Sequence, residues 1–196
     1  HTVYRTGEVH GRLTERAQEV CRLVGHADSA KATDNLWGER WSKLVANSSA
    51  NGVSACTGLP GAELTANDTI RHFQARLASE AIRIGQRLGY KLEEIGHQDP
   101  ELIARAGEGD AAALRQYDEH RLAAPRGSAE QRPSMGQDMA KGRRTEIEFL
   151  NGFVVREGER VGLPARANER LVDIVQKVER GELQQDPRHI TELRLN

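Results

Sequence analysis

The chain has 196 residues, of which 37% are hydrophobic and 29% are charged, and its formal net charge is −1. This composition is typical of a folded globular protein, and a near-neutral chain without a basic tail or an acidic block is unlike a nucleic-acid binder or a protein bound to a membrane surface. No apolar run approaches the roughly 20 residues that a spanning helix needs, and no signal-peptide pattern opens the chain.

The two cysteines, Cys21 and Cys56, are isolated in the sequence. In a domain of this size they indicate reduced thiols, so we expect a cytoplasmic protein. The chain opens with His1 rather than Met, and we expect it to be part of a longer protein.

The first 32 residues predict a strand–helix–strand unit. Residues 1–9 alternate like a short strand, and residues 26–33 are extended. Between them, residues 11–25 predict a helix whose apolar positions recur every three or four residues: Leu13, Ala17, Val20 and Val24. A unit this small cannot bury a core of its own.

From about residue 33 the pattern changes to successive helices. Thr33 or Asp34 caps a long helix that runs to about Cys56, and residues 57–64 are typical of a turn. The clearest amphipathic helix follows, from its cap Asn67 to Gly89. Its apolar stripe consists of Ile70, Phe73, Leu77, Ala81, Ile84 and Leu88.

Residues 91–132 are charged and rich in Gly and Ala. We interpret them as an insertion or a mobile excursion, with helices at about 99–106 and 111–122 and a loop over 121–133.

Two capping boxes follow the loop. Ser134 and Gln137 open one helix, and Thr145 and Glu148 open another over residues 145–162. A last helix covers residues 167–181, with Leu171, Ile174, Val175 and Val178 inside. We expect the tail, residues 183–196, to be loose.

Lys43, Asn47 and Asn51 repeat at a strict four-residue spacing within the long helix, so their side chains form one stripe. Most charged stripes are simply solvated helix faces. An ammonium that donates a proton or holds an oxyanion, beside two amides in fixed places, is however what a reactive site needs.

Ser134 and Glu146 can likewise be explained by helix structure alone or by a functional site. Ser134 is explained by helix capping and Glu146 by the favourable helix dipole of a first turn, although a capping serine can also bind an anion. The seven histidines show no metal-ligand spacing, and the sequence has neither a G-x-G-x-x-G nor a P-loop motif.

Two long stretches, LWGERWSKLVANSSANGVSACTGLPGAEL and PSMGQDMAKGRRTEIEFLNGFVVREGERVGLPARAN, resemble the C-terminal helical domain of ketopantoate reductases. The opening VYRTGEVHGRLTERAQEV resembles the end of their Rossmann domain. The resemblance implies a mainly α fold of the 6-phosphogluconate dehydrogenase C-terminal-like type, preceded by a short β-α-β remnant. It divides the chain into residues 1–32, the end of a nucleotide-binding domain, and residues 33–196, a helical substrate-binding and dimerisation domain with an insertion at about 91–132.

The resemblance also implies site residues. Lys43 matches the general acid that protonates the keto oxygen, and Asn47 and Asn51 match residues that bind the 2-oxo acid. Ser134 matches the residue that binds the substrate carboxylate. Glu146 matches a carboxylate that reaches both the lysine and the ribose side of NADPH. The cofactor is expected to be bound mainly by an upstream domain, so we expect the chain to be inactive alone.

The sequence departs from the family at Gly52, Gly61 and Gly136, where many members carry Pro, Asn and an apolar residue. Because the missing Asn contributes to substrate binding in the family, the 2-oxo acid can be ketopantoate or a related branched or larger one. Two other interpretations stay open: a non-catalytic helical module for dimerisation or binding, which kept the scaffold, and a helical nucleic-acid binder. Neutral charge argues against the latter, and a homodimer is compatible with the others.

Overall fold

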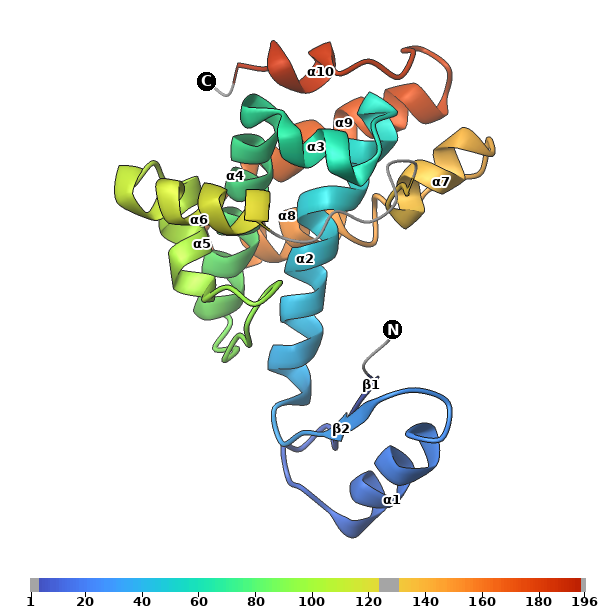
Figure 1. Ribbon diagram of the computed structural model, residues 1–196, viewed down its shortest axis with the longest axis vertical. Helices are drawn as coiled ribbons and strands as arrows, with labels where there is room; N and C mark the ends of the chain where they lie inside the picture. The colour runs from blue at the N-terminus through green and yellow to red at the C-terminus, as the bar shows by residue number, and fades with distance from the viewer. Residues whose placement is uncertain (1–3, 124–130, 195–196) are drawn as a thin grey trace.

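The computed structural model describes residues 4–123 and 131–194. It forms a small lobe at the N-terminus and a larger helical body, joined by one long helix (Figure 1). Parts of the predicted first strand, the 121–133 loop and the tail fall on residues 1–3, 124–130 and 195–196, outside the described residues. No helix of the described residues is long and apolar enough to cross a membrane.

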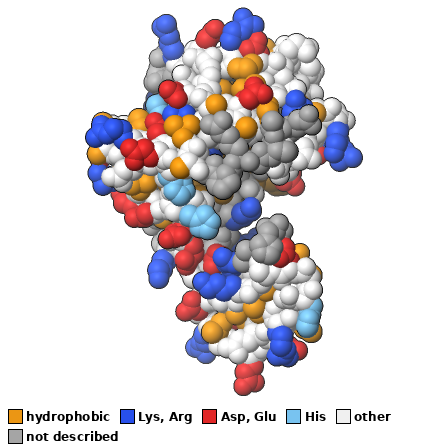
Figure 2. Space-filling view, viewed as in Figure 1, with side chains coloured by type: hydrophobic (Ala, Val, Ile, Leu, Met, Phe, Trp, Pro, Cys, Tyr) orange, Lys and Arg blue, Asp and Glu red, His pale blue; other side chains and the backbone are white. Residues whose placement is uncertain are grey.

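The small lobe is the predicted strand–helix–strand unit. Strand β1 (Tyr4–Thr6) pairs in parallel with β2 (Ala30–Ala32), and α1 (Glu15–Val24) connects them. Thr14 caps α1 by accepting a hydrogen bond from the Ala17 N–H. Apolar side chains reach the surface of this lobe (Figure 2), among them Val9, Leu13, Val20 and Leu23.

Helix α2 (Leu36–Thr57) leaves the small lobe and enters the helical body (Figure 1). Its N-cap is Asn35, which follows the predicted caps Thr33 and Asp34 by two residues and one residue. The Asn35 N–H donates to the hydroxyl of Thr33. Where α2 leaves the lobe, the guanidinium of Arg5 bonds the carboxylate of Glu39 at 2.9 Å. Its far half is fully packed, with Val53, Ala55 and Cys56 buried.

The core is built on α4 (Asp68–Arg87), which is capped by Asn67 as predicted. All six residues of its predicted stripe except the last, Leu88, are buried, and Leu88 packs against the core. The predicted turn at 57–64 is in part wrong, because residues from Gly61 onward form the short helix α3 (Gly61–Ala66). Pro60 is the N-cap of that helix, a position where its missing N–H breaks no helical hydrogen bond.

Helices α5 (Pro100–Gly107) and α6 (Ala111–Ala123) occupy the predicted positions within 91–132. They are packed parts of the body: Ile103, Ala104, Ala113 and Tyr117 belong to the same buried cluster as α4 residues. That these residues are an insertion relative to relatives stays a prediction.

Both predicted capping boxes are wrong. Helix α7 (Ser134–Ala140) has Pro133 as its N-cap, so Ser134 is its first helical residue. Helix α8 (Asn151–Arg160) begins six residues after Thr145, and residues 146–150 form turns before it. The Thr145 N–H donates instead to the carboxylate of Glu179, which comes from α9 (Arg166–Glu179). The carboxylate of Glu179, which is distant in the sequence, thus takes the place of the nearby Glu148 in the predicted capping box.

The tail is not loose. It contains α10 (Arg188–Thr191), whose Ile190 is buried in the core beside residues of α2 and α4. The side-chain amide of Gln185 donates to the Ala55 carbonyl at 2.7 Å, and the Asp186 N–H donates to the Cys56 carbonyl. Sparse apolar residues in a polar segment gave too weak a pattern to predict this docking.

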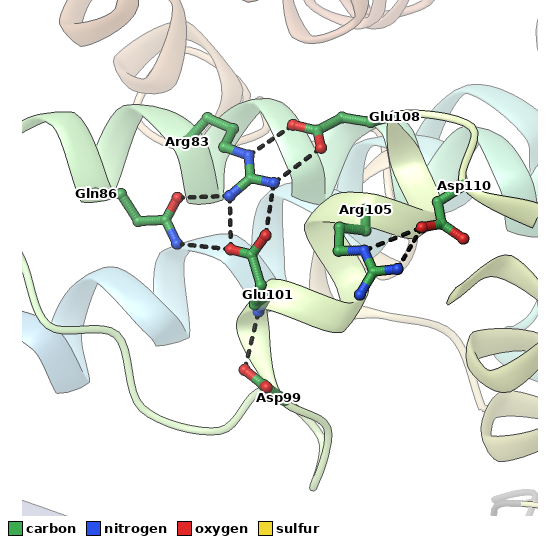
Figure 3. A network of polar contacts seen from close by, with 7 residues as sticks. All are labelled: Arg83, Gln86, Asp99, Glu101, Arg105, Glu108 and Asp110. Carbon is green, nitrogen blue, oxygen red and sulfur yellow. Dashed lines mark hydrogen bonds and ion pairs between the residues drawn. The ribbon is translucent and has the colours of Figure 1, made fainter. Parts of the chain in front are cut away.

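A network of ion pairs ties α5 to α4 (Figure 3). Arg83 of α4 lies between Glu101 and Glu108 and bonds each of them twice, at 2.6 to 2.9 Å. Gln86 joins the same carboxylate of Glu101, and Arg105 pairs with Asp110. The charges of these groups are largely solvated, so the network orients the two helices more than it stabilises them.

Acid is expected to destabilise the fold between about pH 4.5 and pH 2. The Arg83 guanidinium lowers the pKa of Glu101 and of Glu108, hydrogen bonds from Arg16 lower the pKa of Glu8 to about 2, and the Ala113 N–H and Arg105 lower that of Asp110 to about 2. Because the unfolded chain binds these protons at higher pH, the stabilisation is present above the ordinary carboxylate pKa and is lost as pH falls through the folded values.

The measurement is the free energy of unfolding in urea at a series of pH values. Arg83→Met should make the loss between pH 4.5 and 2 smaller, because Glu101 and Glu108 then titrate nearer their ordinary pKa. An unfolding free energy that stays level over this range would contradict the prediction.

Candidate functional site

The predicted stripe on α2 lies at the boundary between solvent and the packed body. Lys43 is exposed, while Asn47 and Asn51 are half-buried. The opposite side of the same turns is buried, with Val45 and Ser48 inside. In the part of the chain that the structure describes, Lys43 has no ion-pair partner, so its ammonium group is available to another molecule.

A cavity of about 540 Å³ opens beside the first half of this stripe. Lys43 and Asn47 line it. The other lining residues come from α2, from the segment after α4, from the turn before α8 and from α8 itself: Trp37, Arg40, Trp41, Leu44, Tyr90, Phe149, Leu150 and Phe153. Because the Trp37 indole N–H donates to the Val9 carbonyl at 3.0 Å, the cavity lies where the small lobe meets the helical body.

Trp41 forms the buried floor of this cavity and is only 5% exposed. Its indole N–H donates to the Ala81 carbonyl of α4 at 2.9 Å. Gly85 makes this packing possible, because a Cβ there would meet the Trp41 Nε1 at 2.2 Å. The Trp41 ring centroid is 5.2 Å from that of Tyr90 and 6.0 Å from that of Phe153, distances typical of favourable aromatic pairs.

The second half of the stripe meets α7. The side-chain amide of Asn51 donates to the hydroxyl oxygen of Ser134 at 3.3 Å. Helix α7 comes this close to α2 at Gly136, where a Cβ would meet the Ser54 hydroxyl oxygen at 2.4 Å. The glycine at position 136 therefore has a physical reason, since a larger side chain would not fit this crossing.

Glu146 is exposed in the turns before α8. Its backbone carbonyl accepts the N–H groups of Phe149 and Leu150, which shapes the turn that carries the cavity-lining Phe149. Among the described residues, no hydrogen bond or ion pair joins its carboxylate to Lys43. The structure therefore brings together Lys43 with Asn47 at one cavity, and Asn51 with Ser134 through a hydrogen bond. The role of Glu146 stays a prediction.

A network of buried polar side chains lies beneath the stripe, and the sequence pattern did not predict it. Asn151 and Asn168 are both fully buried, and the Asn151 amide donates to the Ser48 carbonyl at 2.9 Å and to the Asn168 side-chain oxygen at 2.8 Å. Asn168 in turn donates to Glu80, which also accepts the N–H groups of Ala167 and Asn168 at the start of α9. The sign of this network in the sequence is an asparagine that stands among the apolar residues of a helical repeat.

The described residues contain no group of three or more His, Cys, Asp or Glu that could hold a metal ion. Cys56 is buried in the core, and burial raises the pKa of its thiol to about 12, so it is not a nucleophile. Two further cavities, of about 580 and 490 Å³, lie beside α7 and include neither Lys43 nor the two asparagines of the stripe.

Comparison with known proteins identifies relatives over most of the chain. The family described as "Ketopantoate reductase PanE/ApbA C terminal" matches residues 35–179. A 2-dehydropantoate 2-reductase of Archaeoglobus fulgidus is 30% identical over 188 residues, which are 92% of this chain and 56% of the relative. The enzyme of the same name from Escherichia coli O157:H7 is 30% identical over 146 residues, 74% of this chain and 41% of the relative.

Solved structures agree with these matches. A PanE/ApbA family ketopantoate reductase from Ralstonia eutropha JMP134 superposes with a TM-score of 0.64 at 26% identity, covering 92% of this chain and 51% of that one. A D-mandelate dehydrogenase in complex with NADH has a TM-score of 0.72 at 21% identity, covering 91% and 55%, and at this identity it supports the fold alone. The chain spans about half the length of the relatives it matches.

Proposed function

The chain belongs to the ketopantoate reductase family, as the C-terminal helical domain with a short parallel strand pair before it, and we propose that in the complete protein it forms one wall of the active site of an NADPH-dependent reductase of 2-oxo acids. The observation that carries the proposal is the α2 stripe. Lys43 and Asn47 line a cavity, and on the same stripe Asn51 is bonded to Ser134.

The reaction adds a hydride and a proton to a ketone. The reduced nicotinamide, when bound, supplies the hydride to the keto carbon. The ammonium of Lys43 stabilises the negative charge that develops on the keto oxygen and donates the proton to that oxygen. Asn47, one turn further along α2, holds the 2-oxo acid by donating from its amide.

Asn51 and Ser134 act on the substrate carboxylate as a pair. Because the hydroxyl oxygen of Ser134 accepts from the Asn51 amide, its own O–H is free to donate elsewhere. An O–H that donates to a carboxylate forms a strong charge-assisted hydrogen bond. Ser134 is exposed on the first turn of α7, so this bond can form without rearrangement of the helix.

Part of a nicotinamide cofactor fits the residues present. Glu146 carries an exposed carboxylate, and a carboxylate accepts hydrogen bonds from the hydroxyl groups of a ribose. The pyrophosphate does not fit, because the sequence has no glycine-rich phosphate loop. We therefore assign the ribose side to Glu146 and the phosphates to residues outside this chain.

The test is oxidation of NADPH and of NADH by the complete protein, with ketopantoate and a series of other 2-oxo acids. Turnover of at least one 2-oxo acid, faster with NADPH, is expected. A folded protein that binds NADPH and reduces none of them would overturn the proposal. It would favour the alternative of a helical dimerisation or binding module, and a molar mass from light scattering that rises with concentration would support that alternative.

A further inference from the structure

We propose that the aromatic cavity beside Lys43 binds the side chain of the substrate, and that the preferred substrate is a 2-oxo acid with an aryl group near the keto carbon. The inference rests on the proposed function and adds to it the substrate class. It follows from three observations: the chemistry of the cavity wall, its position relative to Lys43, and the exposure of its rings.

The wall is made largely of rings. Trp37, Trp41, Tyr90, Phe149 and Phe153 all line the cavity. Trp41, Tyr90 and Phe153 already form tilted pairs with centroids 5.2 and 6.0 Å apart. Another aromatic ring can join such a cluster edge-to-face or offset, and gains more than the burial of its area.

The cavity also lies where the side chain of a 2-oxo acid has to go. Lys43 and Asn47 line it together with the rings, and Asn51 and Ser134 lie one further turn along the same stripe. A substrate whose keto oxygen faces Lys43 and whose carboxylate faces Ser134 therefore has its third substituent directed away from α7, toward the rings.

The exposure of the rings in the cavity wall also favours an aryl group as the occupant. Phe149 is 74% exposed, Trp37 47% and Phe153 36%. Large apolar side chains that gather on one surface indicate a binding site. A cavity of about 540 Å³ is within the range of small-molecule sites and is far larger than a methyl group fills. An aryl group on the substrate would cover these protein rings, whereas a small substituent such as a methyl group would leave them exposed to water.

The first experiment compares kcat/KM of the complete protein for pyruvate, ketopantoate and phenylglyoxylate, in wild type and in Phe153→Ala. We expect phenylglyoxylate to exceed pyruvate by at least about 10-fold, since removing contacts in an apolar pocket costs roughly 10- to 200-fold per small group. Phe153→Ala should lower kcat/KM for phenylglyoxylate by about 10-fold more than it lowers kcat/KM for pyruvate. Leu122→Ala is the matched control, because Leu122 is 43% exposed on α6 and does not line the cavity.

Turnover of pyruvate or ketopantoate with no preference for phenylglyoxylate would overturn this inference and leave the proposed function standing. If no 2-oxo acid is turned over, the binding of phenylglyoxylate to the cavity tests the inference instead. Both tryptophans of the chain line the cavity, so phenylglyoxylate should quench their fluorescence with saturation, after correction against free tryptophan. Trp37→Phe should remove part of the signal and Phe153→Ala should weaken binding. No saturable quenching would overturn the inference.

Discussion

Replacing Lys43 by alanine in the complete protein is expected to lower kcat by about 10²- to 10⁴-fold, the usual contribution of a positioned general acid. The change in KM should be small, because the ammonium interacts most strongly with charge that exists only in the transition state. Lys43 is exposed at the cavity and has no ion-pair partner among the described residues, so its removal leaves no buried charge behind. Steady-state kinetics with the best 2-oxo acid is the measurement.

Two variants make this result specific. Lys43→Arg keeps the positive charge but holds its proton too tightly to donate it, so it should recover only part of the lost turnover. Lys177→Ala should leave turnover unchanged, because Lys177 pairs with the partly exposed Asp173 on α9 and does not line the cavity. Wild-type turnover in Lys43→Ala would show that another group protonates the oxygen.

Replacing Asn151 by alanine is expected to lower the free energy of unfolding by about 2–4 kcal/mol, the sum of a small cavity and of polar partners left unsatisfied. Asn151 is fully buried, and its amide is the donor to both the Ser48 carbonyl and the Asn168 side-chain oxygen. Without it, the Asn168 oxygen loses a partner in a site that water does not reach. Urea denaturation followed by circular dichroism is the measurement.

A double-mutant cycle with Asn168→Ala tests the connection. If the two amides act through their shared hydrogen bond, the double variant should be less destabilised than the sum of the single ones, by about 0.5–3 kcal/mol. Gln116→Ala is the control, because it removes an exposed amide from α6 and should change stability by no more than about 0.5 kcal/mol. Strict additivity of Asn151→Ala and Asn168→Ala would contradict a shared network.

Local sequence predicted the long regular elements well. The stripe of α4 and its cap Asn67 were correct, as were the buried residues of α9 and the strand–helix–strand order of the small lobe. In α4 and α9, many apolar residues repeat at one spacing, so the local pattern already shows which face is buried. In α1 the pattern predicted the helix but not its buried face, because Leu13 and Val20 are exposed. The family was also evident from the sequence, because its motifs occur in the expected order and the matching region covers residues 35–179.

The errors share one cause, which is that a distant partner outweighed a local signal. Thr145 and Glu148 have the spacing of a capping box, yet Glu179 of α9 takes the Thr145 N–H and Glu148 pairs with Gln176 of the same helix. The polar tail docks through Ile190 and Gln185 onto elements far away in the sequence. A single hydrogen bond gains little over water, so its location is decided by whichever packing brings the groups together.

The same division applies to the candidate site. The spacing of Lys43, Asn47 and Asn51 placed them on one stripe by the geometry of the helix alone, and the roles of these residues stay predictions. Only the tertiary structure set that stripe beside an aromatic cavity, joined Asn51 to Ser134 and placed the buried asparagines beneath the helix. Helical spacing is a local property of the backbone, whereas contacts between residues about a hundred positions apart depend on how whole helices pack.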